Sequence, residues 1–256
     1  KGFDDSQWKN AIFAEIPRGE CRICEAEPIR VHNELKAVSI KENLLKFQKN
    51  SCDERLSDAE KTRLVTSVDY QTHFGDEEGY LYDFGVNTAG VFKLRIKGEK
   101  GQRVILQAIE YLNEDGTSQC DNVGSFYPTG YAQRDVYICK GDGIEEFIPS
   151  FTYHGCQYCF VTGVTKEQAT EELVTFLEMN TDFEERGSFE CSDKTINFLQ
   201  EMAMRSVKSN FYYFPTDCPQ REKNGWTADA HLTSEAALIN FNPERNYRAW
   251  LYNVRR

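Results

Sequence analysis

The chain has 256 residues, and its 41 acidic against 30 basic side chains give a formal net charge of −11 at pH 7. This acidic balance disfavours nucleic acid and anionic membranes as partners, because both present phosphate. No run of about eighteen apolar residues exists to span a bilayer. We therefore expect a globular protein, long enough for one large domain or two, with neither kind of partner.

Residues 1–30 are polar and punctuated by turn residues, including Pro17, Gly19 and Pro28. This pattern predicts the tail of a preceding β domain or a linker. The opening residues carry no apolar signal-peptide region, so a cytoplasmic location is expected. A secreted or periplasmic location stays open, because a signal peptide could precede Lys1. Residues 28–31 and 37–40 are short strand candidates, whereas 41–69 show irregular apolar spacing and support no assignment.

The middle of the chain has the pattern of a β domain. Short apolar or alternating runs occur at residues 80–84, 91–96, 103–109, 135–139, 145–148 and 157–164. Because a short loop with glycines joins 91–96 to 103–109, these two runs are predicted to form an antiparallel hairpin. The regular turns between strands predict a two-sheet β-sandwich over residues 31–180, and 171–177 is its last strand or a crossover.

Residues 182–188 mark a boundary, and helical periodicity begins just beyond it. Ser192 is the expected N-cap of a first helix, whose apolar face is formed by Ile196, Leu199, Ala203 and Val207. The aromatic cluster at 210–214 ends this helix, and core packing is the preferred interpretation of its rings.

Residues 227–240 have the pattern of a second helix, with Leu232 and Ile239 on its apolar side. A third helix is expected to start with Asn242 as N-cap and Pro243 at the first helical position. Residues 181–256 are therefore predicted to form a helical unit.

The segment from Phe214 to Asp229 combines acids, an arginine and a tryptophan where two prolines exclude a continuous helix. Asp217, Glu222 and Asp229 should thus lie on a loop that runs into a helix N-terminus. A sugar-binding or acid/base site and a rigid capped turn with solvated charges are about equally compatible with this chemistry.

Nine cysteines without a repeat fit reduced thiols better than a disulfide framework. Two Cys-x-x-Cys pairs, Cys21 with Cys24 and Cys156 with Cys159, would form a zinc site if they met. Because the second pair lies in a strand-like run, buried or edge cysteines are the preferred interpretation. His154, at a strand start, is interpreted as a hydrogen-bonded structural group.

The run Asp217-Cys-Pro-Gln-Arg-Glu222, followed by Gly225-Trp226 and Asp229, resembles the active-site signature of the bacterial α-L-rhamnosidases, inverting glycoside hydrolases of family 78. Weaker similarities lie at residues 3–8, 82–87, 112–116, 151–155 and 186–192. The resemblance covers nearly the whole chain. It implies a β-sandwich followed by an (α/α)6 catalytic barrel, of which this chain holds the opening helices.

The resemblance also implies roles for the loop residues. Glu222 matches the family's general acid, and Asp217 and Asp229 match positions that bind rhamnose hydroxyls. Trp226 is a candidate sugar platform, and Arg221 a partner for an acid or a hydroxyl. The expected substrate is a rhamnose-containing glycoside, and no cofactor is expected. Asp229 has a second interpretation, stabilisation of a helix dipole, and Arg221 has another, a structural ion pair.

The family's general base is a glutamate far beyond the signature, and neither Glu235 nor Glu244 has a matching context. The chain alone is therefore expected to be an inactive fragment whose exposed helix faces favour self-association. Two other classes remain open. One is a carbohydrate-binding sandwich that uses Tyr80, Tyr82, Phe126 and Tyr127. The other is a redox or zinc protein that uses the cysteine pairs.

Overall fold

The computed structural model describes residues 4–15, 21–46, 57, 76–120 and 133–255. Most of the unassigned stretch at 41–69, together with Phe126 and Tyr127, lies outside the described residues. Eight strands form one antiparallel sheet in the order β1-β8-β3-β7-β4-β5, with β2 and β6 pairing to β3. The strands are β1 Ile29–Lys36, β2 Ser39–Leu45, β3 Glu77–Lys97, β4 Arg103–Ile109, β5 Arg134–Ile138, β6 Ile144–Phe147, β7 His154–Thr162 and β8 Val174–Thr181.

The long strand β3 makes the sheet curl. Gly85 adopts a φ of 74°, and its N–H donates to Asp83 Oδ1 at 2.7 Å. The register with β7 shifts between Asp83 and Thr88. Glycine tolerates this left-handed backbone, so the strand bends there. Strand β2 pairs only before the bend and β8 and β6 only after it, whereas β7 pairs on both sides of it. The curled sheet encloses a core in which Phe176 lies 5.4 Å from Phe84 and 5.2 Å from Phe92, ring centre to ring centre.

The predicted hairpin between 91–96 and 103–109 is wrong. Both edges of that half of β3 are already occupied, by β8 along Gly90–Leu94 and by β6 along Leu94–Lys97. Strand β4 therefore crosses to β7 and β5 instead. The last strand begins at Val174, three residues later than 171. One curled sheet that folds over its own core is consistent with the expected sandwich.

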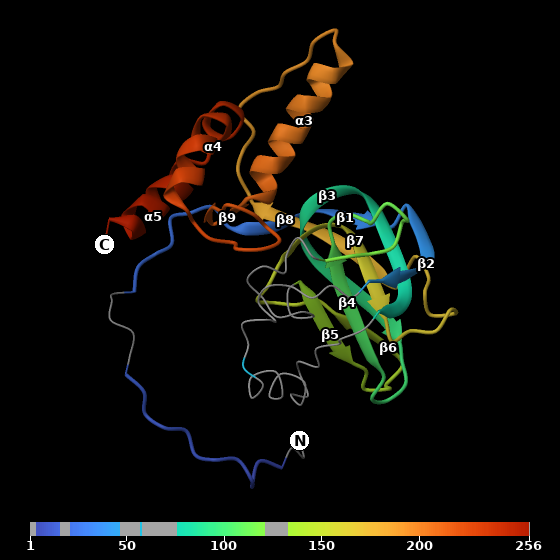
Figure 1. Ribbon diagram of the computed structural model, residues 1–256. Helices are drawn as coiled ribbons and strands as arrows, with labels where there is room; N and C mark the ends of the chain where they lie inside the picture. The colour runs from blue at the N-terminus through green and yellow to red at the C-terminus, as the bar shows by residue number, and fades with distance from the viewer. Residues whose placement is uncertain (1–3, 16–20, 47–56, 58–75, 121–132, 256) are drawn as a thin grey trace.

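Three helices follow the sheet: α3 Lys194–Ser209, α4 Thr227–Asn240 and α5 Glu244–Val254. They gather at one end of the curled sheet (Figure 1), where the base of α3 contacts β3 and β8. The N-cap of α3 is Asp193 and not Ser192, because Asp193 Oδ1 accepts from Thr195 N–H at 2.8 Å. The (α/α)6 barrel stays a prediction.

The N-terminus of α5 also differs from the expected one. Pro243 occupies the cap position and provides no side-chain cap. Asn242 instead uses its backbone N–H to donate to the Glu184 carbonyl at 2.9 Å. The residue expected to cap this helix therefore joins it to the connection that follows the sheet.

Aromatic packing joins the helices to the sheet. Phe183, Phe211 and Phe241 form a buried cluster against which Val207 and Tyr247 pack. Phe211 belongs to the short strand β9 Phe211–Tyr212, and its carbonyl accepts from the Thr181 hydroxyl at 3.0 Å. Core packing of this aromatic stretch is thus confirmed for Phe211 and Tyr212, which are both buried.

Asn246 on α5 is fully buried and ties two distant segments together. Its Nδ2 donates to the Tyr213 carbonyl at 2.8 Å, and its Oδ1 accepts from the Glu27 N–H at 3.1 Å. The segment before β1 is therefore fastened to the third helix.

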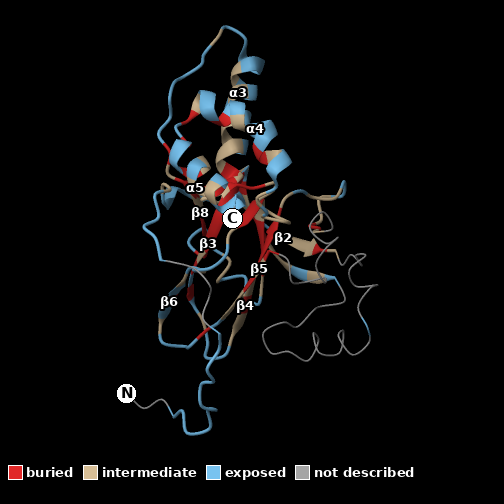
Figure 2. Cartoon of the chain, turned by 90° about the vertical axis from the view of Figure 1, so that its left-hand side faces the viewer, coloured by how far each residue is buried: buried red, intermediate tan, exposed pale blue. Residues whose placement is uncertain are grey.

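The outer sides of the helices are exposed (Figure 2), and apolar residues are among those exposed. The exposed set includes Ile196, Leu199, Leu232, Ile239 and Leu251. We expect the 256-residue chain to self-associate through these faces, because burying apolar surface is favourable. Light scattering across a concentration series should show a mass that rises with concentration, and a constant monomer mass would contradict this expectation. Within the described residues, no helix combines the length and the apolar character needed to cross a membrane.

Candidate active site

A short antiparallel ribbon presents the loop that carries the predicted site. Strand β9 turns at Tyr213, whose φ is 70°, into β10 Phe214–Pro215. Thr216 then donates through its N–H and its hydroxyl to the Asn210 carbonyl, at 2.7 and 3.0 Å. These bonds fix where residues 217–226 leave the ribbon, and the loop ends where α4 begins.

Asp217 closes the loop on itself. Its N–H donates to the Asn224 carbonyl at 3.0 Å, and its Oδ1 accepts from the Asn224 N–H at 2.8 Å. Its Oδ2 accepts from the Cys218 thiol at 2.8 Å. Burial, and then this bond to Asp217, raise the pKa of the Cys218 thiol. Cys218 Sγ in turn accepts from the Glu222 N–H at 3.2 Å, so the backbone of Glu222 is held as well.

The carboxylate of Glu222 is held by the residue predicted to form the sugar platform. Trp226 Nε1 donates to Glu222 Oε2 at 2.8 Å, while the Trp226 ring remains about half exposed, at 53%. The Arg221 guanidinium approaches Glu222 Oε1 at 4.0 Å. Glu222, Trp226 and Arg221 therefore form one cluster in the described structure.

Asp229 lies in the first turn of α4, where a negative charge also stabilises the helix dipole. It lines a cavity of about 140 Å³ together with Asp217, Asn210 and Thr233. The structure thus brings the two predicted hydroxyl-binding aspartates to one hollow. Glu222 is not among the residues that line this cavity.

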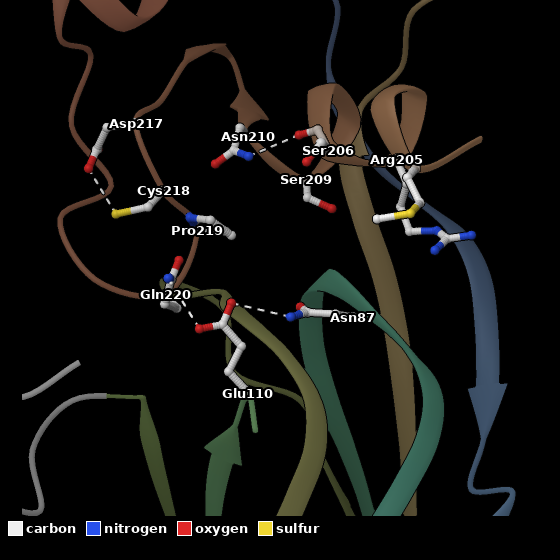
Figure 3. A pocket seen from close by; sticks show the side chains of 11 residues that line it. Asn87, Glu110, Arg205, Ser206, Ser209, Asn210, Asp217, Cys218, Pro219 and Gln220 are labelled. Carbon is white, nitrogen blue, oxygen red and sulfur yellow. Dashed lines mark hydrogen bonds between the residues drawn. The ribbon is translucent and has the colours of Figure 1, made fainter. Parts of the chain in front are cut away.

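A larger cavity of about 420 Å³ lies between the loop, α3 and the sheet (Figure 3). Glu110, which follows β4, accepts from Asn87 Nδ2 at 3.2 Å and from Gln220 Nε2 at 3.3 Å. Asp217 lines this cavity too, so it borders both cavities.

The loop rests directly on strand β7. A β-carbon added to Gly155 would lie 2.5 Å from Pro219 Cγ and 3.2 Å from the Gln220 nitrogen. Gln133 fixes Gly155 from the other side, because it accepts the Gly155 N–H at 2.9 Å and donates to the Gly155 carbonyl at 3.1 Å. Only glycine permits this close approach of loop and strand.

Lys223 extends from the loop into the sheet. Its Nζ donates to the Tyr153 carbonyl and lies 4.6 Å from the centre of the Tyr153 ring. Burial lowers the pKa of Lys223 from 10.5 to about 8, although its interactions with Asp135, Cys218 and Cys156 act in the opposite direction. Burial likewise raises the pKa of Tyr153 to about 12.

The lowered pKa of Lys223 predicts a pH dependence of stability. Between about pH 8 and 10.5 the unfolded chain holds the Lys223 proton and the folded chain does not, so this residue adds stability as pH rises. Relative to Lys223→Met, the wild-type free energy of unfolding should rise by up to about 3 kcal/mol across this window. Urea denaturation of both proteins at pH 7.5, 9 and 10.5 measures the difference, in which shared tyrosine and cysteine titrations cancel. A constant difference across the window would refute the assignment.

The remaining candidates from the sequence are a histidine and two cysteine pairs. His154 is buried, with Nε2 2.9 Å from Asp135 Oδ2, which confirms its interpretation as a hydrogen-bonded group. Cys156 and Cys159 are buried, whereas Cys21 and Cys24 are exposed. Among the described residues, no group of three or more histidine, cysteine or acidic side chains is placed to hold a metal ion.

The sequence predicted the acids on one loop, but it gave no sign that Glu110, Tyr153 and Gly155 lie beneath that loop. Sequence reasoning also passed over Lys223, although this residue directly follows Glu222. The available signal was a second basic residue beside Arg221 in a signature whose charged side chains are otherwise acids.

A curled antiparallel sheet that supports an acid-bearing loop at the start of a helical unit is found in known carbohydrate-active proteins. The bacterial α-L-rhamnosidase concanavalin-like domain matches residues 75–179, and the bacterial α-L-rhamnosidase 6 hairpin glycosidase domain matches residues 184–256. The chain belongs to the bacterial α-L-rhamnosidase family.

Individual relatives agree with this membership. An α-L-rhamnosidase of Formosa agariphila is 36% identical over 71% of this chain and 19% of its own length. One of Streptomyces avermitilis is 34% identical over 69% and 17%. The chain therefore spans about a fifth of the length of these curated relatives.

Solved structures resemble the chain as well. The α-L-rhamnosidase structure from Dictyoglumus thermophilum has a TM-score of 0.75 at 32% identity, over 99% of this chain and 24% of that one. The Streptomyces avermitilis α-L-rhamnosidase complexed with L-rhamnose has a TM-score of 0.70 at 27% identity, over 91% and 19%.

Proposed function

We propose that the complete protein containing this chain is an inverting α-L-rhamnosidase that releases terminal α-L-rhamnose from glycosides. The observation that carries this proposal is the loop 217–229. Its acids stand in the family's signature order, Asp217 and Asp229 share a cavity, and the Glu222 carboxylate is held by Trp226. The relatives are α-L-rhamnosidases by name, and one was solved with L-rhamnose.

In this proposal Glu222 protonates the glycosidic oxygen as the bond to the leaving group breaks. A second carboxylate, roughly 6.5–9.5 Å away, activates water on the opposite face of the sugar. Asp217 and Asp229 accept hydrogen bonds from rhamnose hydroxyls, which are strong when the acceptor is ionised. The half-exposed Trp226 offers its ring to an apolar face of the sugar.

The test is hydrolysis of an aryl α-L-rhamnoside by the complete protein, followed by proton NMR of the first product. Inversion requires that β-L-rhamnose appears before mutarotation produces the α anomer. The α anomer as first product would exclude the inverting mechanism, and absence of hydrolysis over a panel of α-L-rhamnosides would exclude the function.

We also propose that the 256-residue chain alone has no measurable glycosidase activity. Inversion needs a general base, and the family's base lies far from the signature; Glu235 and Glu244 are exposed residues of α4 and α5. Incubation of the purified chain with an aryl α-L-rhamnoside should release no phenol above the buffer rate. Turnover that Glu222→Gln abolishes would refute this proposal.

The domain assignment stays part of the proposal. Residues 1–30 are a preceding tail or linker, 31–180 the sandwich, and 181–256 the opening of an (α/α)6 barrel. A non-catalytic carbohydrate-binding sandwich is less well supported, because Tyr82, one of its proposed contact residues, has a fully buried side chain.

A further inference from the structure

Lys223 has surroundings that are unusual for a loop lysine. Lys223 adopts a φ of 56°, a left-handed backbone conformation that is unfavourable for residues other than glycine. Such strained backbone persists where neighbouring contacts over-determine it, and it gathers at functional sites. The Lys223 side chain is also drawn into the protein, although burying an ammonium group is costly. Lys223, which directly follows Glu222, therefore has two energetic costs, a strained backbone and a buried ammonium group.

The contacts of Lys223 account for both costs. The ammonium donates to the Tyr153 carbonyl and lies over the Tyr153 ring. That ring is itself held in place, because it stacks on Tyr212 with ring centres 3.7 Å apart and an angle of 10°. The charge of Asp135 also favours the ammonium, and Asp135 is fixed by its bond to His154. Lys223 therefore connects the loop to a rigid part of the sheet.

A second contact defines how the loop lies on the sheet. Pro219 and Gln220 sit against Gly155, two residues after Tyr153. Lys223 and Pro219 therefore reach one short segment of the sheet from two points of the same loop. Glu222 lies between them in sequence, and its backbone N–H is held by Cys218. Two supports on either side of Glu222 fix its place relative to the sheet.

We propose that Lys223 is a positioning residue that anchors the loop to the Tyr153 backbone, so that the curled sheet sets the position of Glu222 relative to Asp217 and Asp229. This inference rests on the proposed function of Glu222. It gives the sheet a part in catalysis without any contact between sheet and substrate. The acid is expected to protonate the leaving oxygen efficiently only while this anchor holds.

The first test measures the anchor without reference to activity. In the complete protein, Lys223→Met should speed hydrogen exchange of the Glu222 and Asn224 amides, both of which are hydrogen-bonded within the loop. Lys208→Met is the matched control, since Lys208 also pairs with an oxygen, that of Glu185, and lies over an aromatic ring, that of Phe241. It should leave exchange in residues 217–226 unchanged. Should Lys223→Met destabilise the whole protein, Lys223→Gln replaces it, because its side chain stays polar but is uncharged and one atom shorter, so it cannot reproduce the anchor.

The second test separates positioning from mere stability. On an aryl α-L-rhamnoside, Lys223→Met should lower kcat by up to about 10²-fold, the cost of a misplaced catalytic group, with little change in KM. Lys223→Arg, which keeps the charge and the donors, should recover most of kcat. Unchanged loop exchange in Lys223→Met, or faster exchange with unchanged kcat, overturns the proposal. If the wild-type protein hydrolyses no rhamnoside, the proposed function fails, and the exchange result alone decides whether Lys223 anchors the loop.

Discussion

Replacing Glu222 with glutamine in the complete enzyme should lower kcat about 10²–10⁴-fold, the usual contribution of a general acid. Glutamine keeps the size of the side chain and an acceptor for the Trp226 indole N–H, but its amide protons are too weakly acidic to be transferred to the leaving oxygen. Binding of rhamnose should change little, because Asp217 and Asp229 remain. Steady-state kinetics with an aryl α-L-rhamnoside, at a fixed pH, measures the loss.

The leaving group gives this prediction a sharper form. A nitrophenolate departs with little protonation, so the defect of Glu222→Gln should be smallest there and larger for an alkyl rhamnoside, whose oxygen needs a proton. Glu235→Gln is the matched control, as Glu235 is an exposed acid of the adjacent helix α4. An equal loss of kcat for both leaving groups, or a comparable loss in Glu235→Gln, would show that Glu222 is not the general acid.

Adding one methyl group to Gly155 should destabilise the loop and the sheet beneath it. In Gly155→Ala the new β-carbon would lie 2.5 Å from Pro219 Cγ and 2.9 Å from Pro219 Cβ. The proline ring is rigid, so loop and strand must separate. We expect a loss of about 1–3 kcal/mol in the free energy of unfolding, the usual cost of overpacking. At roughly 2–4 °C for each kcal/mol, calorimetry should detect the fall in Tm.

Gly187→Ala controls for the general effect of adding a side chain to glycine. A β-carbon at Gly187 would meet no atom within 4 Å, and its Tm should stay within a degree or so of wild type. Because the loop carries Glu222, Gly155→Ala should also lower kcat in the complete enzyme. A Gly155→Ala protein with wild-type Tm would show that loop and strand are not in close contact.

Much of the fold was predictable because local sequence determines it. The bounds of α4 follow from apolar periodicity and from the loop before it, and β4 and β5 follow from runs of alternating residues. The pairing of β3 was not predictable in this way. It depends on which strands occupy both of its edges, and β8 reaches one edge from about eighty residues further along the chain. Local turn residues contain no information about that competition.

The candidate site likewise has a part that local sequence predicts and a part that depends on distant segments of the chain. Asp217, Glu222 and Asp229 are close in sequence, so one short motif predicts them together, although their roles remain to be tested. Glu110, Tyr153 and Gly155 lie in or next to distant strands, and the weak similarity at 151–155 does not indicate that its residues contact the loop. They become visible only where the sheet brings them beneath the loop.

Asn246 has a consequence for how this chain can be dissected. Its side chain forms hydrogen bonds with the backbone of Glu27 and with the carbonyl of Tyr213. The residues that precede the sheet are therefore attached to α5. A cut between the two family regions, at residues 180–183, would thus leave a buried amide on one piece and its partner backbone on the other. Either piece expressed alone lacks the hydrogen bond between Glu27 and Asn246. Recombinant work should therefore keep these two residues in one polypeptide.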